Sequence, residues 1–210
     1  LVFQPAMDRE FRATPVSIGL AFEALALTTA DGERLDGWHV PAKQGSAARG
    51  LAIIFHGNAG NISHRLDYLR MFNDLGFASL IVDYRGYGRS TGAASEQGSY
   101  LDAETAWHFL TQLPSQSSLP SLVLLDLQLS SQHGCDLLTR LRADARFAHL
   151  PVVIFTTSDD PSDVARCYAA GANGYVVKPG TFTDLIHCAG DICRYWVDRN
   201  RVPSMVETRC

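Results

Sequence analysis

The chain has 210 residues, of which 46% are hydrophobic and 19% charged, and its formal net charge is -4 at pH 7. This composition excludes intrinsic disorder, collagen-like repeats and a long coiled coil. The 18 basic residues are scattered among 22 acidic ones, which disfavours binding to nucleic acid because such binding needs clustered positive charge. Since the sequence has no run of 18 apolar residues and no recognisable signal peptide, we expect a cytoplasmic protein that does not associate with a membrane.

The first elements along the chain are predicted to be a β-hairpin and two buried strands. Apolar, partly alternating stretches over 22–28 and 35–40 flank Asp31-Gly32, a dipeptide typical of hairpin turns. Short continuous apolar runs over 51–55 and 78–82 predict parallel strands that are buried on both faces. Helices are predicted over 62–75, ended by Gly76, and over 100–113.

A stretch rich in serine and proline, 114–120, is the best candidate for a boundary. Strands and helices alternate after it. The predicted strands cover 122–125, 152–155 and 174–177, and the predicted helices cover 135–141, 162–170 and 183–197. This alternation is typical of a parallel sheet with helices on both faces. We therefore expect an α/β protein.

All five cysteines lie after residue 130: Cys135, Cys167, Cys188, Cys193 and Cys210. An odd number without a C-x-x-C pair argues against a disulfide framework and against a zinc site. We expect reduced thiols, no metal and no cofactor.

Two segments that each follow a predicted strand carry a family signature. They are His56-Gly57-Asn58-Ala59-Gly60-Asn61 and Asp83-Tyr84-Arg85-Gly86-Tyr87-Gly88-Arg89-Ser90. Residues 1–113 thereby resemble the N-terminal half of the α/β-hydrolase superfamily, in its serine-hydrolase branch with an HGN-type loop. The resemblance implies that the backbone N–H of Asn58 helps to form an oxyanion hole. Independently, a small-residue turn between a strand end and a helix start aims backbone donors at developing negative charge. The alternative is a turn with no further role.

The nucleophile elbow of that family, G-x-S-x-G, is absent, and its serine would fall near Gln128. The ordinary Ser-His-Asp mechanism is therefore not expected. Other nucleophile candidates are Ser130, Ser131, Ser158 and Asp126, and the base candidates are His56 and His133. Each serine can equally be a turn or helix-capping residue, and His133 a solvated loop residue.

A second signature lies in the later part of the chain. Two of the predicted strands end next to Asp126 and Thr156. The last predicted strand contains Tyr175, and Lys178 and Pro179 follow it. Residues 121–200 look like the later part of a two-component receiver domain, followed by a tail over 201–210. The resemblance implies a phospho-accepting Asp126 and a switch residue Thr156. A receiver also needs an acidic pair for Mg²⁺ after its first strand, where this chain has His56-Gly57-Asn58. We therefore expect weak or no phosphorylation.

The length allows one domain or two small ones. Because the central strands of both families share the same local order, we predict a single hybrid domain over 1–210, joined at 114–120. Its fold would be a three-layer αβα sandwich with one continuous, mainly parallel sheet of flavodoxin-like core order, plus the antiparallel hairpin. The predicted order is the hairpin, then 78–82, 51–55, 122–125, 152–155 and 174–177. Polar residues would then share one rim: His56, Asn58, Asp126, Thr156, Ser158, Tyr175 and Lys178.

The function predicted first is weak hydrolysis of small, activated carboxylic esters, with Asn58 in the oxyanion loop and one of the candidates above as nucleophile. One alternative is a receiver-like signalling or interaction module. Another is a fusion protein with no evolved activity. The expected partner is a small-molecule ester substrate, and a homodimer is among the assemblies that the sequence allows.

Overall fold

The computed structural model describes residues 10–43, 49–56, 60–111, 122–127, 134–143 and 147–202. The chain divides into two compact units. The N-terminal unit comprises 1–119 and 129–131, and the C-terminal unit comprises 120–128 and 132–210. In the described ranges, no helix has the length and apolarity that a bilayer span requires.

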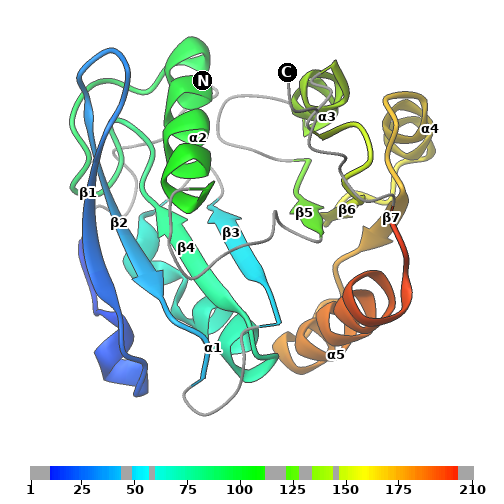
Figure 1. The fold of residues 1–210 in the computed structure, drawn as a ribbon, viewed down its shortest axis with the longest axis horizontal. Helices are drawn as coiled ribbons and strands as arrows, with labels where there is room; N and C mark the ends of the chain where they lie inside the picture. Colours follow the sequence, from blue (N-terminus) through cyan, green and yellow to red (C-terminus); the bar gives the residue numbers. More distant parts are fainter. Residues whose placement is uncertain are drawn as a thin grey trace, which may run out of the picture. The chain divides into compact units, whose positions relative to one another are not determined.

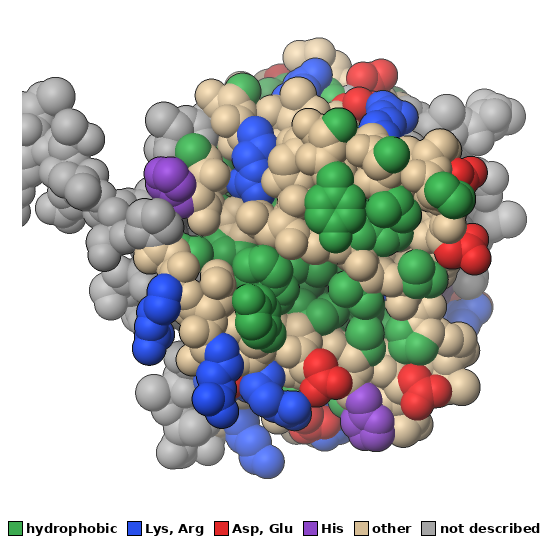
Figure 2. Space-filling view, turned by 90° about the vertical axis from the view of Figure 1, so that its right-hand side faces the viewer, with side chains coloured by type: hydrophobic (Ala, Val, Ile, Leu, Met, Phe, Trp, Pro, Cys, Tyr) green, Lys and Arg blue, Asp and Glu red, His purple; other side chains and the backbone are tan. Residues whose placement is uncertain are grey.

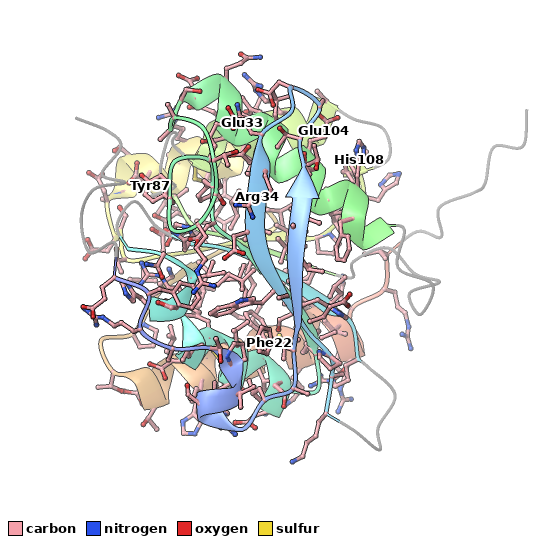
Figure 3. All side chains as sticks on the ribbon, turned by 90° about the vertical axis from the view of Figure 1, so that its left-hand side faces the viewer. Phe22, Glu33, Arg34, Tyr87, Glu104 and His108 are labelled. Atoms are coloured by element: carbon pink, nitrogen blue, oxygen red, sulfur yellow. A yellow bond between two sulfur atoms is a disulfide. The ribbon has the colours of Figure 1, made fainter. Side chains whose placement is uncertain are left out.

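The N-terminal unit is built on a four-stranded sheet of order β1-β2-β4-β3, in which β3 and β4 are parallel and the other pairs antiparallel. Its elements are η1 Pro15–Ile18, β1 Glu23–Thr28, β2 Arg34–Val40, β3 Leu51–Phe55, η2 Ile62–His64, α1 Leu66–Asp74, β4 Ala78–Val82 and α2 Glu96–Thr111 (Figure 1). Phe22 and Glu33 lie at opposite ends of the hairpin (Figure 3).

Local sequence explains these elements. At the hairpin turn, Gly32 has a φ of 90°, and the Thr29 hydroxyl donates to Asp31 at 2.6 Å. Every residue of β4 is buried, as its continuous apolar run predicts. Leu80 and Val82 form a core cluster with Leu25 of β1 and Ala106 of α2, which places α2 over one face of the sheet.

The helix predicted over 62–75 is interrupted near its start. Asn61 accepts a hydrogen bond from the Ser63 backbone N–H at 3.0 Å, and this cap begins the short 3₁₀ helix η2. The α-helix α1 begins only at Leu66. Asn is a strong capping residue because its side-chain oxygen satisfies an otherwise unpaired backbone N–H. The helix predicted over 100–113 also starts earlier than expected, at Glu96.

The C-terminal unit has a three-stranded parallel sheet of order β5-β6-β7. Its elements are β5 Val123–Leu125, α3 Gly134–Ala143, β6 Val152–Thr156, α4 Pro161–Ala169, β7 Gly174–Val177, α5 Phe182–Cys193 and the π-helix η4 Arg194–Arg199. The central strand β6 is fully buried, in keeping with a position between two neighbours and under helices.

The α/β class and the strand order within each unit agree with the sequence prediction. The single continuous sheet is not confirmed, because the described strands form two sheets, β1-β2-β4-β3 and β5-β6-β7. The junction predicted at 114–120 lies outside the described residues. The single hybrid domain over 1–210 stays a prediction.

The expectation of reduced thiols is wrong for two of the five cysteines. Cys135 of α3 and Cys167 of α4 form a disulfide, with Cα atoms 5.4 Å apart. Both side chains are buried. An odd count argues only against a framework in which every cysteine is paired, and it does not exclude one pair that helix packing brings together. Cys188 is a free thiol, and Cys210 lies outside the described residues.

Candidate functional sites

His56 follows β3 and is buried beneath the loop after β4. Its side chain has no exposed surface, and Nε2 lies 3.1 Å from Asp83 Oδ1. The imidazole also packs on two aromatic rings, with centroids 5.1 Å from that of Tyr84 and 5.5 Å from that of Tyr87. A ring enclosed in this way lacks the access to substrate that a general base requires. The His56 side chain is therefore packed in the interior of the N-terminal unit.

The predicted oxyanion residue Asn58 lies outside the described residues, as do Ser130, Ser131 and His133. Asn61 and Ile62, which follow Asn58 in the sequence, make hydrogen bonds to other segments of the N-terminal unit. Ile62 N–H donates to Asp83 Oδ1 at 2.9 Å. Asn61 Nδ2 donates to the Glu10 carbonyl at 3.2 Å, so the N-terminal segment also reaches this turn.

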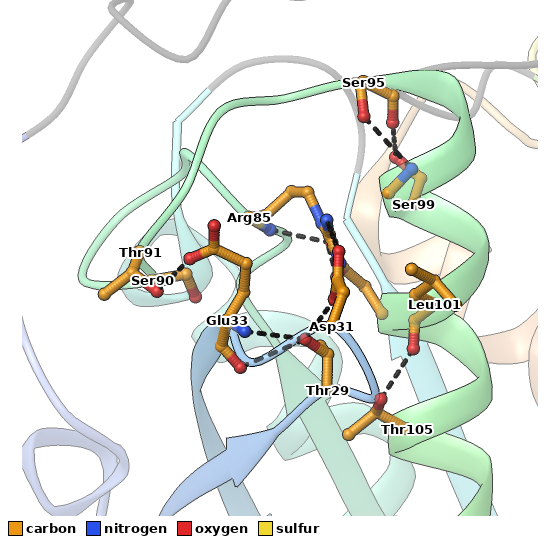
Figure 4. Close-up of polar contacts among 12 residues, drawn as sticks. Thr29, Asp31, Glu33, Arg85, Ser90, Thr91, Ser95, Ser99, Leu101 and Thr105 are labelled. Carbon is orange, nitrogen blue, oxygen red and sulfur yellow. Dashed lines mark hydrogen bonds and ion pairs between the residues drawn. The ribbon is translucent and has the colours of Figure 1, made fainter.

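Arg85, in the loop after β4, sits in a charged network that the sequence did not reveal (Figure 4). Its guanidinium contacts both oxygens of Asp31 at 2.7 and 3.0 Å, and its Nε donates to buried Asp102 of α2 at 2.9 Å. Hydrogen bonds from Arg85 lower the pKa of Asp31 and in turn raise the pKa of Arg85. The network ties the hairpin turn and α2 to the loop that contains Asp83.

In the C-terminal unit, Asp126 and Lys178 meet at the carboxyl ends of β5 and β7. Lys178 Nζ lies 2.6 Å from Asp126 Oδ2. Thr156, at the end of β6, is fully buried, and its carbonyl accepts the Lys178 N–H at 2.7 Å. Asp126, Thr156 and Lys178 thus lie at one edge of this sheet, as expected for the ends of adjacent parallel strands.

Ser158 and Tyr175 are joined through the loop between β6 and α4. The Tyr175 hydroxyl donates to the Ser158 carbonyl at 3.0 Å, and burial raises the pKa of the Tyr175 phenol. The Ser158 hydroxyl donates to Asp163 at 2.7 Å. This serine is bound to a carboxylate instead of the imidazole that activates serine nucleophiles.

The residues at Asp126 do not fit a Mg²⁺ ion. Mg²⁺ prefers several oxygen ligands in octahedral geometry, and the rim residues beside Asp126, Thr156 and Lys178, add no second carboxylate. No group of three or more His, Cys, Asp or Glu side chains within the described ranges is arranged to hold a metal. His56, predicted from the sequence to lie where a receiver carries its acidic pair, is buried against Asp83.

Comparison with known proteins separates two ancestries. Residues 94–189 match the response regulator receiver domain family. The probable methanogenesis regulatory protein FilR2 of Methanothrix harundinacea is 32% identical over 144 residues, which cover 68% of this chain and 83% of FilR2. The C-terminal part is an α/β domain of the receiver kind, and the chain belongs to the response regulator receiver family.

The N-terminal part is similar to different proteins. Protein bem46 of Schizosaccharomyces pombe is 37% identical over 111 residues, 52% of this chain. The α/β hydrolase domain-containing protein WAV2 of Arabidopsis thaliana is 38% identical over 109 residues, 51% of this chain. This chain spans only about a third of these relatives, 37% of bem46 and 35% of WAV2.

Solved structures show the same two likenesses at the level of fold. The Pyrococcus furiosus esterase Pf2001 superposes with a TM-score of 0.63 at 13% identity, over 89% of this chain and 95% of the esterase. The phosphorylated cyanobacterial phytochrome response regulator RcpA superposes with a TM-score of 0.52 at 20% identity, over 75% of this chain and all of RcpA. The chain is therefore a chimera of a hydrolase-like N-terminal part and a receiver part.

Proposed function

We propose that the chain is a weak hydrolase of small, activated carboxylic esters. The observation that carries the proposal is the connection from β3 to η2. It leaves the carboxyl end of a parallel strand and leads into a capped helical turn. Backbone N–H groups in such a place are suited to stabilise an oxyanion. The similarity to WAV2 over residues of this part supports the same class of reaction.

In the proposed reaction, an oxygen nucleophile forms a bond to the ester carbonyl carbon. The carbonyl oxygen takes the negative charge and is stabilised by the Asn58 backbone N–H. Collapse of this intermediate breaks the bond to the alcohol, which leaves as its anion. If the nucleophile is a serine, its hydroxyl proton passes to a base, for which His133 is the candidate. Water then adds to the acyl carbon and breaks its bond to the side chain, which takes back a proton as the acid leaves. An activated ester needs no general acid because its leaving group is already a stable anion. Without the nucleophilic serine of a G-x-S-x-G elbow, oxyanion stabilisation alone still supports a slow reaction.

Ser130 belongs to the same unit as Asn58 and is the nucleophile proposed for that unit. Asp126 and Ser158 belong to the C-terminal unit and are separate nucleophile proposals, and His133 is the base candidate. The Asp126 carboxylate would have to attack from beside the Lys178 ammonium group, which lies 2.6 Å from its Oδ2. Ser158 would first have to lose its hydrogen bond to Asp163. His56 is given a positioning role instead of a role as base, because its ring is enclosed.

Hydrolysis of p-nitrophenyl acetate by the purified chain tests the proposal. Asp126→Asn, Ser130→Ala and Ser158→Ala are compared, and we expect one of them to lower kcat by about a hundredfold or more. Turnover no faster than that of heat-denatured protein would exclude the hydrolase. Equal activity in all three variants would exclude these residues as nucleophiles and leave direct attack by water.

A receiver-like interaction module is the second candidate, and the Asp126–Lys178 pair favours it. Large apolar side chains are exposed on this unit: Tyr168 of α4, Val177 of β7 and Tyr195 of η4 are 52%, 44% and 57% exposed. Figure 2 views the side on which α4 and β7 lie in Figure 1, and hydrophobic side chains gather there. Such side chains suit contact with a protein partner.

The module is tested with acetyl phosphate and Mg²⁺, followed by intact mass measurement. Because the residues around Asp126 do not fit the metal, we expect no added phosphoryl group. A mass gain that disappears in Asp126→Asn would favour the module over the hydrolase. Failure of both the ester and the phosphorylation experiments would favour a fusion protein with no evolved activity.

A further inference from the structure

We propose that Asp83 is the positioning residue of the connection between β3 and η2. The catalytic part of this inference rests on the hydrolase function proposed above, because the connection includes Asn58. The structural part rests only on described residues at the two ends of the connection.

One carboxylate oxygen contacts both ends. Asp83 directly follows β4 and is fully buried. Its Oδ1 accepts the Ile62 N–H at 2.9 Å and lies 3.1 Å from His56 Nε2. His56 precedes the connection and Ile62 follows it. Asp83 Oδ1, in the residue directly after β4, therefore sets the distance between His56 and Ile62.

Each end is held further by its own neighbours. The His56 ring packs on Tyr84 and Tyr87, which follow Asp83 in the same loop. At the other end, Asn61 caps η2 by accepting from Ser63 N–H at 3.0 Å. These contacts limit the motion of each end separately, whereas the contacts of Asp83 relate the two ends to each other.

The other carboxyl oxygen of Asp83, Oδ2, lies in the protein interior near a second carboxyl group. This oxygen is buried and makes no hydrogen bond within the described residues. Asp36 lies across the strand pair, where its carbonyl accepts the Asp83 N–H at 2.9 Å. Burial and the charge of Asp83 raise the pKa of Asp36. A buried polar atom without a hydrogen bond costs free energy, so a carboxyl group retained at this position fits a positioning role for its other oxygen, Oδ1.

Gly88 makes room for this carboxylate. A Cβ atom added at Gly88 would collide with Asp83 Oδ2. The backbone of Gly88 also has a φ of 49°. The loop after β4 thus both carries Asp83 and leaves the space that its side chain needs, and Gly88→Ala would displace the carboxylate without removing it.

Asp83→Asn in the full chain tests the structural part, with amide hydrogen exchange as the readout. The variant keeps an oxygen for Ile62 N–H but removes the negative charge facing His56. We expect exchange at residues 60–64 to accelerate on the order of tenfold, with exchange in β6 unchanged. Asp102→Asn is the matched control, because Asp102 is also fully buried but contacts Arg85. Unchanged exchange at 60–64 in Asp83→Asn, or equal acceleration in the control, would overturn the inference.

Gly88→Ala provides a second variant should Asp83→Asn fail to fold. Gly32→Ala is its control, because Gly32 also has a positive φ but has open space around its Cβ position. Faster exchange at 60–64 in Gly88→Ala alone supports the inference, and equal effects in both variants oppose it.

The kinetics of ester hydrolysis test the proposed contribution of Asp83 to catalysis. We expect Asp83→Asn to lower kcat about tenfold or more with little change in KM, since an oxyanion contact acts in the transition state. An unchanged kcat despite faster exchange would overturn the catalytic part. A wild-type chain without turnover would instead refute the proposed hydrolase, while the exchange experiment would still decide the structural role of Asp83.

Discussion

Lys178 Nζ and Asp126 Oδ2 lie 2.6 Å apart at the carboxyl edge of the β5-β6-β7 sheet. The side chains are 16% and 27% exposed, so water screens the pair only in part. Both residues carry the resemblance to a receiver. Their contact gives the pair a structural role that can be measured.

A double-mutant cycle with Asp126→Asn and Lys178→Met measures that role. We expect a coupling free energy of about 1 kcal/mol in urea unfolding at low salt, because the pair is partly buried and well aligned. High salt should reduce the coupling. Additive effects of the two substitutions at low salt would show that the contact does not contribute to stability.

Because Cys135 and Cys167 form a disulfide, we expect reduction to lower the free energy of unfolding. The two cysteines are 32 residues apart in the sequence, and opening a loop of this size lowers the free energy of unfolding by about 3–4 kcal/mol. Thiol titration of the unfolded, unreduced chain should miss both cysteines. Cys188→Ser serves as a control, since Cys188 is free and its loss should leave the effect of reduction unchanged. Reactivity of all five cysteines before reduction would contradict the bond.

Because the pKa of Asp36 is raised in the folded chain, we expect the free energy of unfolding to decrease as the pH rises. Burial and the charge of Asp83 raise its pKa, while Arg89 and Arg34 oppose the shift. Above the ordinary pKa of a carboxyl group, the unfolded chain loses the Asp36 proton while the folded chain still binds it. The free energy of unfolding therefore falls until the pH passes the raised pKa.

Asp36→Asn should remove this decrease. Urea unfolding of both proteins between about pH 4 and pH 7 measures the effect, with Asp67→Asn on exposed α1 surface as the control. Parallel pH profiles for the wild type and Asp36→Asn would contradict the assignment.

Arg85→Met tests the charged network in the N-terminal unit. The substitution leaves Asp102 buried without its cationic partner, so we expect a loss of about 3–5 kcal/mol in the free energy of unfolding. Arg194→Met breaks a pair with Asp191 in which both side chains are exposed, and should cost less than about 0.5 kcal/mol. Similar losses in the two variants would show that burial of Asp102 does not determine the effect.

The strands were predictable because their signal is local. The continuous apolar run 78–82 became β4 with the same bounds, and the run 51–55 became β3. The rim residues Asp126, Thr156 and Lys178 were predictable for a related reason: each lies at or just after the end of a parallel strand, and such ends share one edge.

The environments of His56, Arg85 and Cys135 were not predictable in this way. A histidine after a strand looks the same in sequence whether its ring faces a rim or a core. Arg85 meets Asp31 and Asp102 across gaps of 54 and 17 residues, and no periodic pattern connects such positions. The disulfide of Cys135 depends on how α3 and α4 pack, which cysteine spacing does not encode.

The central proposal is that the hydrolase-like part catalyses ester hydrolysis and that Asp83 positions the connection between β3 and η2. The most direct measurement is the steady-state hydrolysis of p-nitrophenyl acetate by the wild type, Asp83→Asn and Asp102→Asn side by side. We predict saturable turnover by the wild type and by Asp102→Asn, and a kcat lowered about tenfold or more in Asp83→Asn. A rate that rises linearly with substrate and equals that of heat-denatured protein would contradict the claim.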